Sequence, residues 1–331
     1  METLILTDHE VKKLLTWSEI LEAVESAFKQ KGLGLVQMPA KIYLYYRKYH
    51  GDLRSMPAFL EKLDISAVKI VNVHPLNRTQ NNLPTVMAVI VVIDPSNGAP
   101  VAIMGGTTIT DMRTGAAGAI AAKYLARNDS KIVGLVGAGA QARTQLTALL
   151  KVYDKLEEVR VWSRTEQTRN NFVSEIKQVC ENKIRVISAT SVQLAVEGAD
   201  IVVTTTPSLK PLVMNEMVSA GMHINCIGAD AEGKEEIEPK ILMRAKIVVD
   251  DWAQASHSGE INVPLRRKLI TKENVWAEIG EIVAGLKPGR QRQDEITVFT
   301  STGLAVQDAV AAEIAYRKAL DAKVGRLIKI I

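Results

Sequence analysis

The sequence predicts an α/β protein in which a doubly wound parallel sheet is joined to a mostly antiparallel α+β domain. From about residue 108 onward, short apolar strands alternate with helix-length segments, which indicates crossover connections between parallel strands. Before that residue, alternating and β-branched runs are separated mainly by turns, as in an antiparallel sheet. A chain of 331 residues is long enough for two cores. We therefore expect one domain at residues 1–115, completed by 305–331, and a second at 116–304.

The first domain is predicted to begin with an amphipathic helix and to continue as a sheet. Thr16 and Glu19 have the spacing of a capping box, and apolar residues recur at helical spacing from Ile20 to Phe28, before Gly32. Strands are expected to follow at residues 41–46, 65–73, 85–93 and 100–104. The end of the chain is expected to return to this domain, with helical periodicity at 302–320 and a strand within 325–331.

The second domain is predicted to consist of parallel strands bridged by helices. Its strands are expected at residues 131–136, 159–162, 184–187, 201–204, 223–227 and 247–250. In such a sheet, ligands bind at the carboxyl ends of the strands, near the point where the strand order reverses. The loops that follow these strands are therefore the first place to look for functional residues.

Composition argues against several classes of function. The 41 Lys and Arg residues nearly balance the 37 Asp and Glu residues, and they are scattered along the chain, so nucleic acid is not an expected partner. Cys180 and Cys226 lack CxxC spacing, and the five histidines form no HExxH pattern, so neither a disulfide nor a metal site is predicted. No apolar run approaches the length of a membrane span, and the first residues do not resemble a signal peptide. We expect a cytoplasmic protein.

A glycine-rich turn follows the first predicted strand of the second domain. It consists of Gly137, Ala138, Gly139, Ala140, Gln141 and Ala142. The first glycine allows a sharp turn, Gly139 lets a pyrophosphate approach the backbone, and Ala142 allows the helix to pack closely on the strand. Amides at the helix start would then hold the phosphates. Because the motif lies between a predicted strand and a predicted helix, we expect a Rossmann-type dinucleotide site rather than an ordinary tight turn.

The second strand of this domain ends where a dinucleotide site contacts the adenosine ribose. NAD sites usually have Asp or Glu there, but this chain has Ser163, Arg164 and Thr165. Ser163 carries no charge to repel a 2′-phosphate, Arg164 can pair with one, and Thr165 can donate a hydrogen bond to it. The alternative is that Arg164 is a solvated loop charge. We expect NADP(H) as the preferred cofactor, with NAD(H) as the other candidate.

Other polar residues follow strands at the same edge of the predicted sheet. Thr205 and Thr206 come at the end of the fourth strand, where their hydroxyls either line the nicotinamide-ribose site or reflect β propensity alone. Asp230 follows the fifth strand and precedes several acidic residues. A solvated acidic loop is the simpler interpretation, but the position of Asp230 makes it a candidate acid or base.

Three cationic residues lie in or beside apolar strands of the first domain. Lys69 interrupts the apolar run at 67–71, and Lys41 and Arg54 have comparable settings. Each alone is more simply explained as a side chain that reaches solvent or as part of a structural ion pair. Together they predict a site for a carboxylate. Arg113, just before the small-residue helix that joins the domains, is a candidate to contact both cofactor and substrate.

These residues belong to an ordered series of motifs that runs along essentially the whole chain. The motifs are LRSMP at 53–57, KIVNVHP at 69–75, LPTV at 83–86, RTGA at 113–116, GAGAQA at 137–142, IGAD at 227–230, HSGE at 257–260 and STGLAVQD at 301–308. The series resembles the ornithine cyclodeaminase/mu-crystallin family, and within it the archaeal alanine dehydrogenase branch. The resemblance implies a homodimer in which the N-terminal sheet, joined by the C-terminal helix, supplies the substrate site and the dimer contact.

The same resemblance implies a role for each candidate residue. Lys69 matches the family's essential lysine, and Asp230 matches its cyclodeaminase acid. Lys41 and Arg54 match the cations that bind the substrate carboxylate, and Arg113 matches an arginine that bridges substrate and cofactor. The residues expected to contact the cofactor, with Ser301 near the nicotinamide, are Thr85, Arg113, Thr114, Gly137, Ala138, Gly139, Ala140, Gln141, Ser163, Arg164, Thr165, Thr205, Thr206, Ile227, Gly228, Ala229 and Ser301.

Two positions depart from patterns within that family. Ornithine cyclodeaminases have a glutamate at the position of Arg54, where it binds the distal amine of ornithine, so a cation there disfavours that substrate. NAD-linked members have an aspartate at the position of Ser163, whereas Ser163, Arg164 and Thr165 are similar to the NADPH-using mu-crystallin branch. Cofactor and substrate therefore need not follow the same branch.

The residues and the resemblance together predict an NAD(P)-dependent oxidoreductase that acts on a small L-amino acid, 2-oxo acid or imine. The favoured reaction is the reversible conversion of L-alanine to pyruvate and ammonia. In this hypothesis Lys69 polarises the carbonyl or imine and relays a proton, and Asp230 assists with water or ammonia. The alternatives are reduction of a cyclic imine, such as a ketimine or pyrroline-2-carboxylate, and then ornithine cyclodeamination. A different class is a non-catalytic, crystallin-like protein that binds NADPH or a small ligand.

Overall fold

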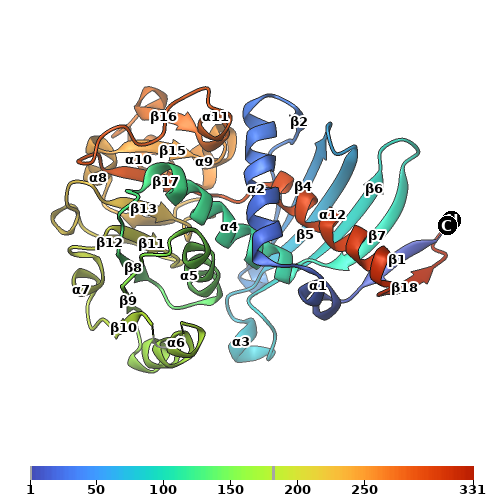
Figure 1. Cartoon of the computed structure of the whole chain (residues 1–331), viewed down its shortest axis with the longest axis horizontal. Coiled ribbons are helices and arrows are strands. Elements are labelled where there is room, and N and C mark those ends of the chain that lie inside the picture. The colour runs from blue at the N-terminus through green and yellow to red at the C-terminus, as the bar shows by residue number, and fades with distance from the viewer. Residues whose placement is uncertain (1, 181–182) are drawn as a thin grey trace. The chain divides into compact units, whose positions relative to one another are not determined.

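A computed structural model describes residues 2–180 and 183–331 of the chain. The chain is divided into two units: unit 1 comprises Met1–Arg113 and Leu304–Ile331, and unit 2 comprises Thr114–Gly303 (Figure 1). The first boundary falls within helix α4 (Thr107–Leu125), and the second lies just before helix α12 (Ala305–Ala322). The two units have the predicted fold classes, a doubly wound parallel sheet in unit 2 and a mostly antiparallel sheet with helices in unit 1.

Unit 2 is built on an eight-stranded sheet in the order β10-β9-β8-β11-β13-β17-β15-β16, and every neighbouring pair is parallel. All six predicted strands are confirmed to within one residue at either end. The strands are β8 (Ile132–Val136), β9 (Glu158–Trp162), β10 (Arg185–Ser188), β11 (Ile201–Thr204), β13 (His223–Cys226), β15 (Lys246–Val249), β16 (Val275–Glu278) and β17 (Thr297–Thr300), and a separate two-stranded sheet pairs β12 (Leu209–Val213) with β14 (Glu235–Ile237).

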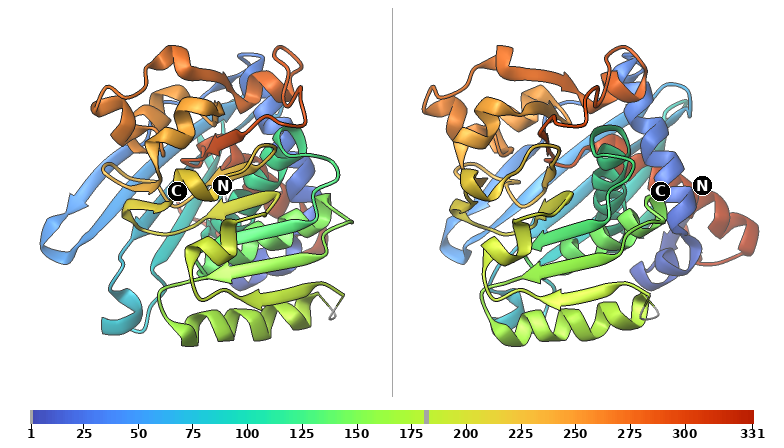
Figure 2. Two further views of the ribbon diagram at one scale, coloured as in Figure 1. Left: turned by 90° about the vertical axis from the view of Figure 1, so that its left-hand side faces the viewer. Right: turned by 60° about the vertical axis from the view of Figure 1, so that its left-hand side comes forward.

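Helices cover both faces of the parallel sheet (Figure 2). The strand order reverses between β8 and β11, so right-handed crossovers place the helices before and after the reversal on opposite faces. Besides α4, the helices of unit 2 are α5 (Ala140–Val152), α6 (Glu166–Val179), α7 (Val192–Val196), α8 (Pro239–Arg244), α9 (Trp252–Ser258), α10 (Asn262–Arg266) and α11 (Ile279–Val283), with 3₁₀ turns η2 (Asn215–Met217) and η3 (Lys272–Asn274).

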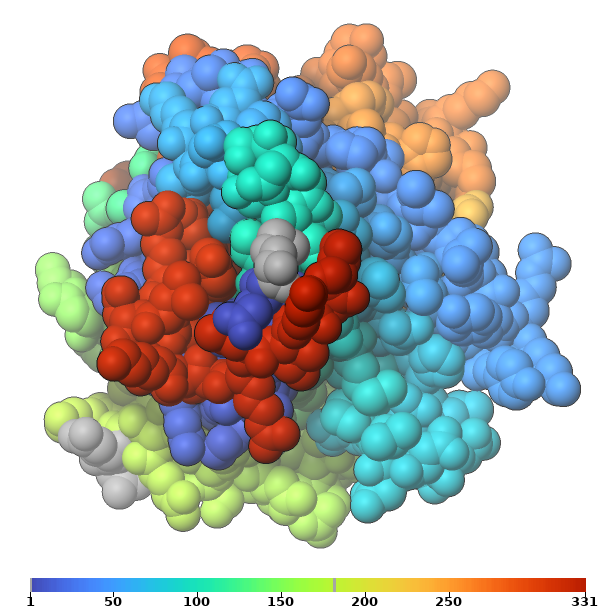
Figure 3. All heavy atoms as spheres, turned by 90° about the vertical axis from the view of Figure 1, so that its right-hand side faces the viewer, coloured from blue at the N-terminus to red at the C-terminus, as the bar shows by residue number. Residues whose placement is uncertain are grey.

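Unit 1 is built on an eight-stranded sheet in the order β18-β1-β7-β6-β5-β4-β2, with β3 also paired to β4. Neighbouring strands are antiparallel except for β1 and β7, which are parallel. The predicted return of the C-terminus is confirmed, since β18 pairs with β1 and lies beside it at the surface (Figure 3). The strands are β1 (Thr3–Leu6), β2 (Val36–Gln37), β3 (Ile42–Tyr46), β4 (Gly51–Leu60), β5 (Ile65–Val73), β6 (Val86–Asp94), β7 (Ala99–Gly105) and β18 (Arg326–Ile328).

The C-terminal helix α12 covers one face of this sheet. It packs across β4, β5 and β6 and against α2, and its buried face is rich in alanine, which allows a close approach. The predicted capping box of α2 is confirmed: Thr16 Oγ1 accepts from Glu19 N–H, and the Glu19 carboxylate accepts from Thr16 N–H. The helices of unit 1 are α1 (Asp8–Leu14), α2 (Trp17–Gly32), α3 (Asn77–Gln80) and α12, with a 3₁₀ turn η1 (Arg47–Tyr49).

Strand β4 was not among the predicted strands, because its Gly, Asp, Ser and Pro residues disfavour β structure. Pro57 lies in the middle of β4 and is opposite Val68 of β5. On the other side of β4, strand β3 pairs with residues 51–55 and β2 pairs with residues 59–60. Pro57 therefore lies in a gap between two neighbours, where no ladder hydrogen bond is required on that side.

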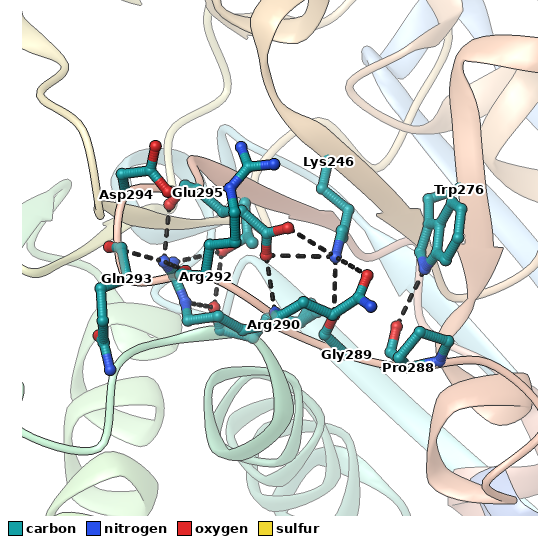
Figure 4. Close-up of polar contacts among 12 residues, drawn as sticks. Lys246, Trp276, Pro288, Gly289, Arg290, Arg292, Gln293, Asp294 and Glu295 are labelled. Carbon is teal, nitrogen blue, oxygen red and sulfur yellow. Dashed lines mark hydrogen bonds and ion pairs between the residues drawn. The ribbon is translucent and has the colours of Figure 1, made fainter.

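Strand β17 was also not predicted, and it occupies the centre of the sheet of unit 2 between β13 and β15. It is reached through residues 284–296, which are neither helix nor strand. Side chains fix this segment instead (Figure 4). The Arg290 guanidinium donates to Leu125 O at 2.6 Å, to Glu295 O at 2.7 Å and to Thr297 Oγ1 at 3.1 Å. These contacts lie at the amino end of β17, whereas ligands bind doubly wound sheets at the carboxyl ends of the strands.

Membrane-spanning helices and metal-binding clusters are both absent from residues 2–180 and 183–331. None of their helices combines the length and the apolar character that crossing a membrane requires. Among the same residues, no group of three or more His, Cys, Asp or Glu side chains is placed to bind a metal ion. Cys180 and Cys226 are buried free thiols.

Candidate functional site

The turn after β8 requires glycine at its first position. Gly137 has a φ of 118°, and its N–H donates to Trp162 O at 2.8 Å. A Cβ at this position would collide with Thr205 Oγ1, so a side chain does not fit. The loops after β8 and β11 therefore meet where the strand order reverses, which is where a doubly wound sheet binds its ligand.

Gly139 leaves open space at the start of α5. It is the N-cap residue, and nothing lies within 4 Å of the position where its Cβ would be. No side chain caps the first amides of α5, in contrast to the threonine-capped α2. Ala138 and Ala142 are buried and Gln141 is half-buried, whereas Ala140 is exposed. The positive end of the helix and the missing side chain at its N-cap together fit a pyrophosphate group.

The end of β9 carries cations and hydroxyls. Ser163 Oγ donates to Thr165 O at 3.2 Å, and Thr165 is the N-cap of α6, where it accepts from Thr168 N–H at 3.4 Å. Arg164 is exposed. Arg169, which the sequence reasoning did not single out, donates from Nη1 to Ser163 O at 2.9 Å, and its buried Nε has no hydrogen-bond partner among the described residues. Two guanidinium groups therefore belong to this strand end.

The loops after β11 and β13 hold each other in place. Thr205 Oγ1 is buried and has no hydrogen-bond partner within the described part of the chain. Both the N–H and the hydroxyl of Thr206 donate to the buried carboxylate of Glu236. The N–H groups of Ile227 and Gly228 donate to the last carbonyl of β11, and a Cβ at Gly228 would collide with the backbone of Thr206. These loops have little freedom to move apart.

Asp230 and Ser301 occupy the ends of the next strands at the same edge. Asp230 is half-buried beyond the buried Ala229, and the Lys234 ammonium donates to its carboxylate. Ser301 directly follows β17, is buried, and donates its N–H to Cys226 O at 3.0 Å. Because all strands of the sheet are parallel, the predicted residues of unit 2 that follow strands share its carboxyl edge.

The sheet register in unit 1 places the predicted cations on one face. Lys69 lies opposite Met56, and Arg54, two residues before Met56, lies opposite Tyr43. Side chains two residues apart point to the same face of a sheet, so Lys69 and Arg54 share the face that α12 covers. Lys41 immediately precedes β3, and its charge acts on Lys69.

Lys69 belongs to a buried cluster with Arg113, Gln307 and Asp308, here called the Lys69 cluster. Lys69 Nζ donates to Asp308 Oδ1 at 2.8 Å, and Arg113 Nε donates to the same oxygen at 3.0 Å. Arg113 Nη1 also donates to Gln307 Oε1 at 2.9 Å. Burial, and then the neighbouring Arg113 charge, lower the pKa of Lys69 to about 7, although Asp308 opposes the shift. Lys69 therefore exists in protonated and neutral forms near neutral pH.

Positive charge exceeds negative charge around this cluster. Arg54 is buried, with Nε 2.8 Å from Asp52 Oδ1 and its guanidinium 5.4 Å from the centre of the Tyr43 ring. With Lys41 and the Lys69 cluster, four basic side chains are set against three carboxyl groups, those of Asp52, Asp308 and Asp111. Burial raises the pKa of Asp111, a third carboxyl nearby, to about 6. An anionic substrate suits this surplus.

Thr85 and Thr114 complete the set of predicted residues. Thr85 lies in unit 1 just before β6, and its carbonyl accepts from His74 N–H at 2.8 Å. Thr114 begins unit 2 and is buried, and its carbonyl accepts from Gln145 Nε2 at 2.7 Å. The structure thus places the substrate candidates other than Asp230 in unit 1, and the cofactor candidates other than Thr85 and Arg113 in unit 2.

Known proteins resemble this chain over essentially its whole length. The model of the ornithine cyclodeaminase/mu-crystallin family matches residues 1–323. The chain belongs to this family. Among its relatives, the alanine dehydrogenase of Archaeoglobus fulgidus is 50% identical over 331 residues, which cover 99% of each chain. A solved archaeal alanine dehydrogenase dimer with bound NAD has a TM-score of 0.94 at 48% identity, with 100% of both chains covered. The pyrroline-2-carboxylate reductase of Thermococcus litoralis, solved with NADH and L-proline, has a TM-score of 0.94 at 38% identity over 98% of this chain and 100% of that chain.

Besides Arg169, the sequence reasoning gave no role to three polar residues of this ornithine cyclodeaminase/mu-crystallin protein. Asp308 and Gln307 lie in the STGLAVQD motif but were given no role, although a carboxylate among alanines and valines of a helix indicates a buried charge that needs a partner. Glu236 lies in a run of acidic residues that resembles a solvated loop. Only the fold shows that its side chain is buried.

Proposed function

We propose that this chain is an NAD(P)-dependent oxidoreductase that interconverts L-alanine and water with pyruvate and ammonium. The observation that carries the proposal is the buried Lys69 cluster in a chain that is 50% identical, over its whole length, to an archaeal alanine dehydrogenase. When bound, the dinucleotide accepts the hydride from C2 of alanine, or returns it in the reverse reaction. The protein must then bind the carboxylate, orient C2 and move protons.

The residues of unit 1 are proposed to handle the amino acid. Arg54 and Lys41 bind the α-carboxylate, because cations exceed carboxylates around them. Lys69, in its neutral form, accepts a proton as alanine is oxidised, and its protonated form polarises the imine or carbonyl in the reverse direction. Asp308 fixes the direction of Nζ through the hydrogen bond of 2.8 Å. Asp230 assists with water or ammonia.

The strand-end loops of unit 2 are proposed to hold the dinucleotide. Amides from Gly139 to Gln141 bind the pyrophosphate, and Ser163, Arg164 and Thr165 contact the adenosine ribose. The nicotinamide half is proposed to contact Thr205, Thr206, Ile227, Gly228, Ala229 and Ser301, with Thr85, Arg113 and Thr114 completing the site.

NADP(H) is proposed as the preferred dinucleotide, and NAD(H) as the weaker one. The support is the exposed Arg164, the neutral Ser163 and the additional guanidinium of Arg169 at the end of β9. One charge-assisted contact to a 2′-phosphate is worth roughly 1.5–3 kcal/mol, which corresponds to a factor of about 10 to 150 in affinity. Fluorescence titration with NADPH and NADH tests this preference, and equal dissociation constants would contradict it.

A cyclic imine reductase is the second candidate. Its support is the likeness to the pyrroline-2-carboxylate reductase with bound NADH and L-proline. The deciding experiment compares oxidation of NADPH and of NADH with pyruvate plus ammonium, with pyrroline-2-carboxylate and with no substrate. Faster turnover of the imine than of pyruvate plus ammonium would favour a cyclic imine reductase over an alanine dehydrogenase. Absence of turnover with retained dinucleotide binding would favour a crystallin-like binding protein.

A homodimer is proposed as the working assembly. The face of the unit 1 sheet opposite α12 exposes the apolar side chains of Ile42, Leu44, Ile70 and Val89. An exposed apolar sheet face of this kind marks a protein contact, and a two-fold dimer buries it against itself. Sedimentation of the wild type and of an Ile70→Glu variant tests this assembly, since the variant should shift toward monomer. A wild-type monomer would refute it.

A further inference from the structure

Glu236, in β14, ties two strand-end loops together through one carboxylate. Its side chain is fully buried. Oε1 accepts from Thr206 N at 2.6 Å and from Thr206 Oγ1 at 2.8 Å. Oε2 accepts from Gly228 N at 2.8 Å and from Thr204 Oγ1 at 2.7 Å. The loop after β11 and the loop after β13 are thus held at a spacing set by a single side chain.

A second buried glutamate, Glu260, holds the segment that carries Glu236. Glu260 Oε1 accepts from the N–H groups of Glu236 at 2.7 Å and Ile237 at 2.8 Å. Its own N–H donates to Thr300 Oγ1, at the end of β17, at 2.8 Å. Oε2 is buried and has no hydrogen-bond partner in the described ranges. The ends of β11, β13 and β17 are therefore linked through two glutamates.

The fold raises the pKa values of the two carboxyl groups to different extents. Burial raises the pKa of both, and the pKa of Glu260 lies well above its ordinary value because the Glu236 charge adds to the effect of burial. Four hydrogen-bond donors stabilise the ionised form of Glu236, whereas Glu260 receives two. The pKa of Glu260 is therefore raised further than that of Glu236.

We propose that Glu236 is a positioning residue for the nicotinamide half of the dinucleotide. The inference rests on the proposed dinucleotide site. Glu236 fixes the loops that contain Thr205, Thr206 and Gly228, whereas none of its four hydrogen bonds involves the turn from Gly137 to Gly139 that is proposed to bind the pyrophosphate. Loss of the Glu236 charge should therefore affect one half of the cofactor selectively.

The two glutamates allow a matched pair of substitutions. Each oxygen of Glu236 accepts one backbone N–H, so the amide group of Glu236→Gln must face the N–H of Thr206 or of Gly228 in either orientation. In Glu260→Gln the amide oxygen can keep both backbone donors, and the NH2 group takes the place of Oε2, which accepts no hydrogen bond within the described residues. Glu235→Gln is a further control, because Glu235 lies in the same strand and faces Arg267 at 3.6 Å.

The experiment titrates each variant with NADPH and with 2′-phospho-ADP, which lacks the nicotinamide riboside. Glu236→Gln should weaken NADPH binding at least about tenfold, the effect of losing one charge-assisted hydrogen bond that holds these loops in place. Its affinity for 2′-phospho-ADP should stay within about twofold of the wild type, as should both affinities of the two control variants. In steady-state kinetics the KM for NADPH should rise while the KM for pyruvate stays unchanged.

Two results with Glu236→Gln would overturn the inference: wild-type affinity for both ligands, or an equal loss for both, which a general defect in folding would produce. If that variant does not fold, Thr204→Val removes one hydroxyl donor from the same carboxylate at nearly constant volume. It should weaken NADPH binding several-fold with the same selectivity, and unchanged binding would overturn the inference. A wild-type protein that binds neither ligand would instead refute the proposed function.

Discussion

Replacement of Lys69 by methionine is predicted to change how the stability of the protein depends on pH. Lys69 is fully buried, and burial lowers its pKa from an ordinary 10.5 to about 7. Between these two values the unfolded chain binds a proton at this lysine that the folded chain does not bind. Stability therefore rises with pH across this window, while below about pH 7 both states are protonated and the cost is constant.

The magnitude follows from the size of the shift. A difference of about 3.5 pKa units corresponds to about 5 kcal/mol of destabilisation at low pH, and one proton corresponds to about 1.4 kcal/mol for each pH unit. Methionine keeps the bulk of the side chain without the charge, and it leaves Asp308 paired with Arg113. The stability of the wild type relative to K69M should thus rise by about 2.7 kcal/mol between about pH 7.5 and pH 9.5.

Urea unfolding followed by tryptophan fluorescence measures this difference at each pH. The matched control is K62M, which removes an exposed lysine in the turn after β4 and should show no comparable slope. K69M should also lose turnover while it still binds the dinucleotide. A stability difference between wild type and K69M that stays constant with pH would refute the reasoning, because Lys69 would then be as protonated in the folded as in the unfolded state.

The remaining predictions concern catalysis and cofactor binding. The value of kcat/KM for alanine oxidation should rise with pH through about 7, because neutral Lys69 forms in this range. D308N should move the midpoint of this rise to lower pH, since Asp308 raises the pKa of Lys69. A midpoint that stays the same or moves to higher pH would count against Lys69 as the base. Gly139→Ala should change the stability of the unliganded protein by less than about 1 kcal/mol, yet weaken NADPH binding at least about a hundredfold by filling the pyrophosphate site. Gly137→Ala should instead destabilise the fold itself, because φ is positive at this residue. A lower melting temperature for Gly139→Ala than for Gly137→Ala would contradict these separate roles of the two glycines. R164A should weaken NADPH binding roughly tenfold or more and leave NADH binding nearly unchanged. Equal losses of affinity for the two dinucleotides would contradict the proposed contact between Arg164 and the 2′-phosphate.

The sequence predicts those parts of the fold that depend on local patterns. The predicted strands of unit 2, which are β8, β9, β10, β11, β13 and β15, are short apolar runs separated by helix-length segments, and such runs are recognisable without a structure. Strand β17 directly follows residues 284–296, which are neither helix nor strand, so it breaks the alternation on which the prediction depends. Strand β4 has an unfavourable composition and becomes a strand because β5 pairs along its whole length.

In the candidate site, too, features that depend on neighbouring residues could be predicted, and contacts that depend on the fold could not. The glycine turn and the strand cations could be predicted, because a glycine next to a strand or a lysine in an apolar run is unusual in itself. Asp308 and Glu236 could not be given roles, because a carboxylate has different meanings in a solvated loop and in a core. Their partners, Lys69 and Gly228, are 239 and 8 residues away in sequence, and the fold alone brings them together.

Transfer of deuterium from the dinucleotide to the product tests the central claim most directly. The enzyme is incubated with pyruvate, ammonium and NADPH in which both hydrogens at C4 of the nicotinamide are deuterium, with NADH labelled in the same way in parallel, and the product is analysed by mass spectrometry. The account predicts L-alanine with one deuterium at C2. Alanine without deuterium, deuterated lactate in its place, or no product from either dinucleotide would contradict it.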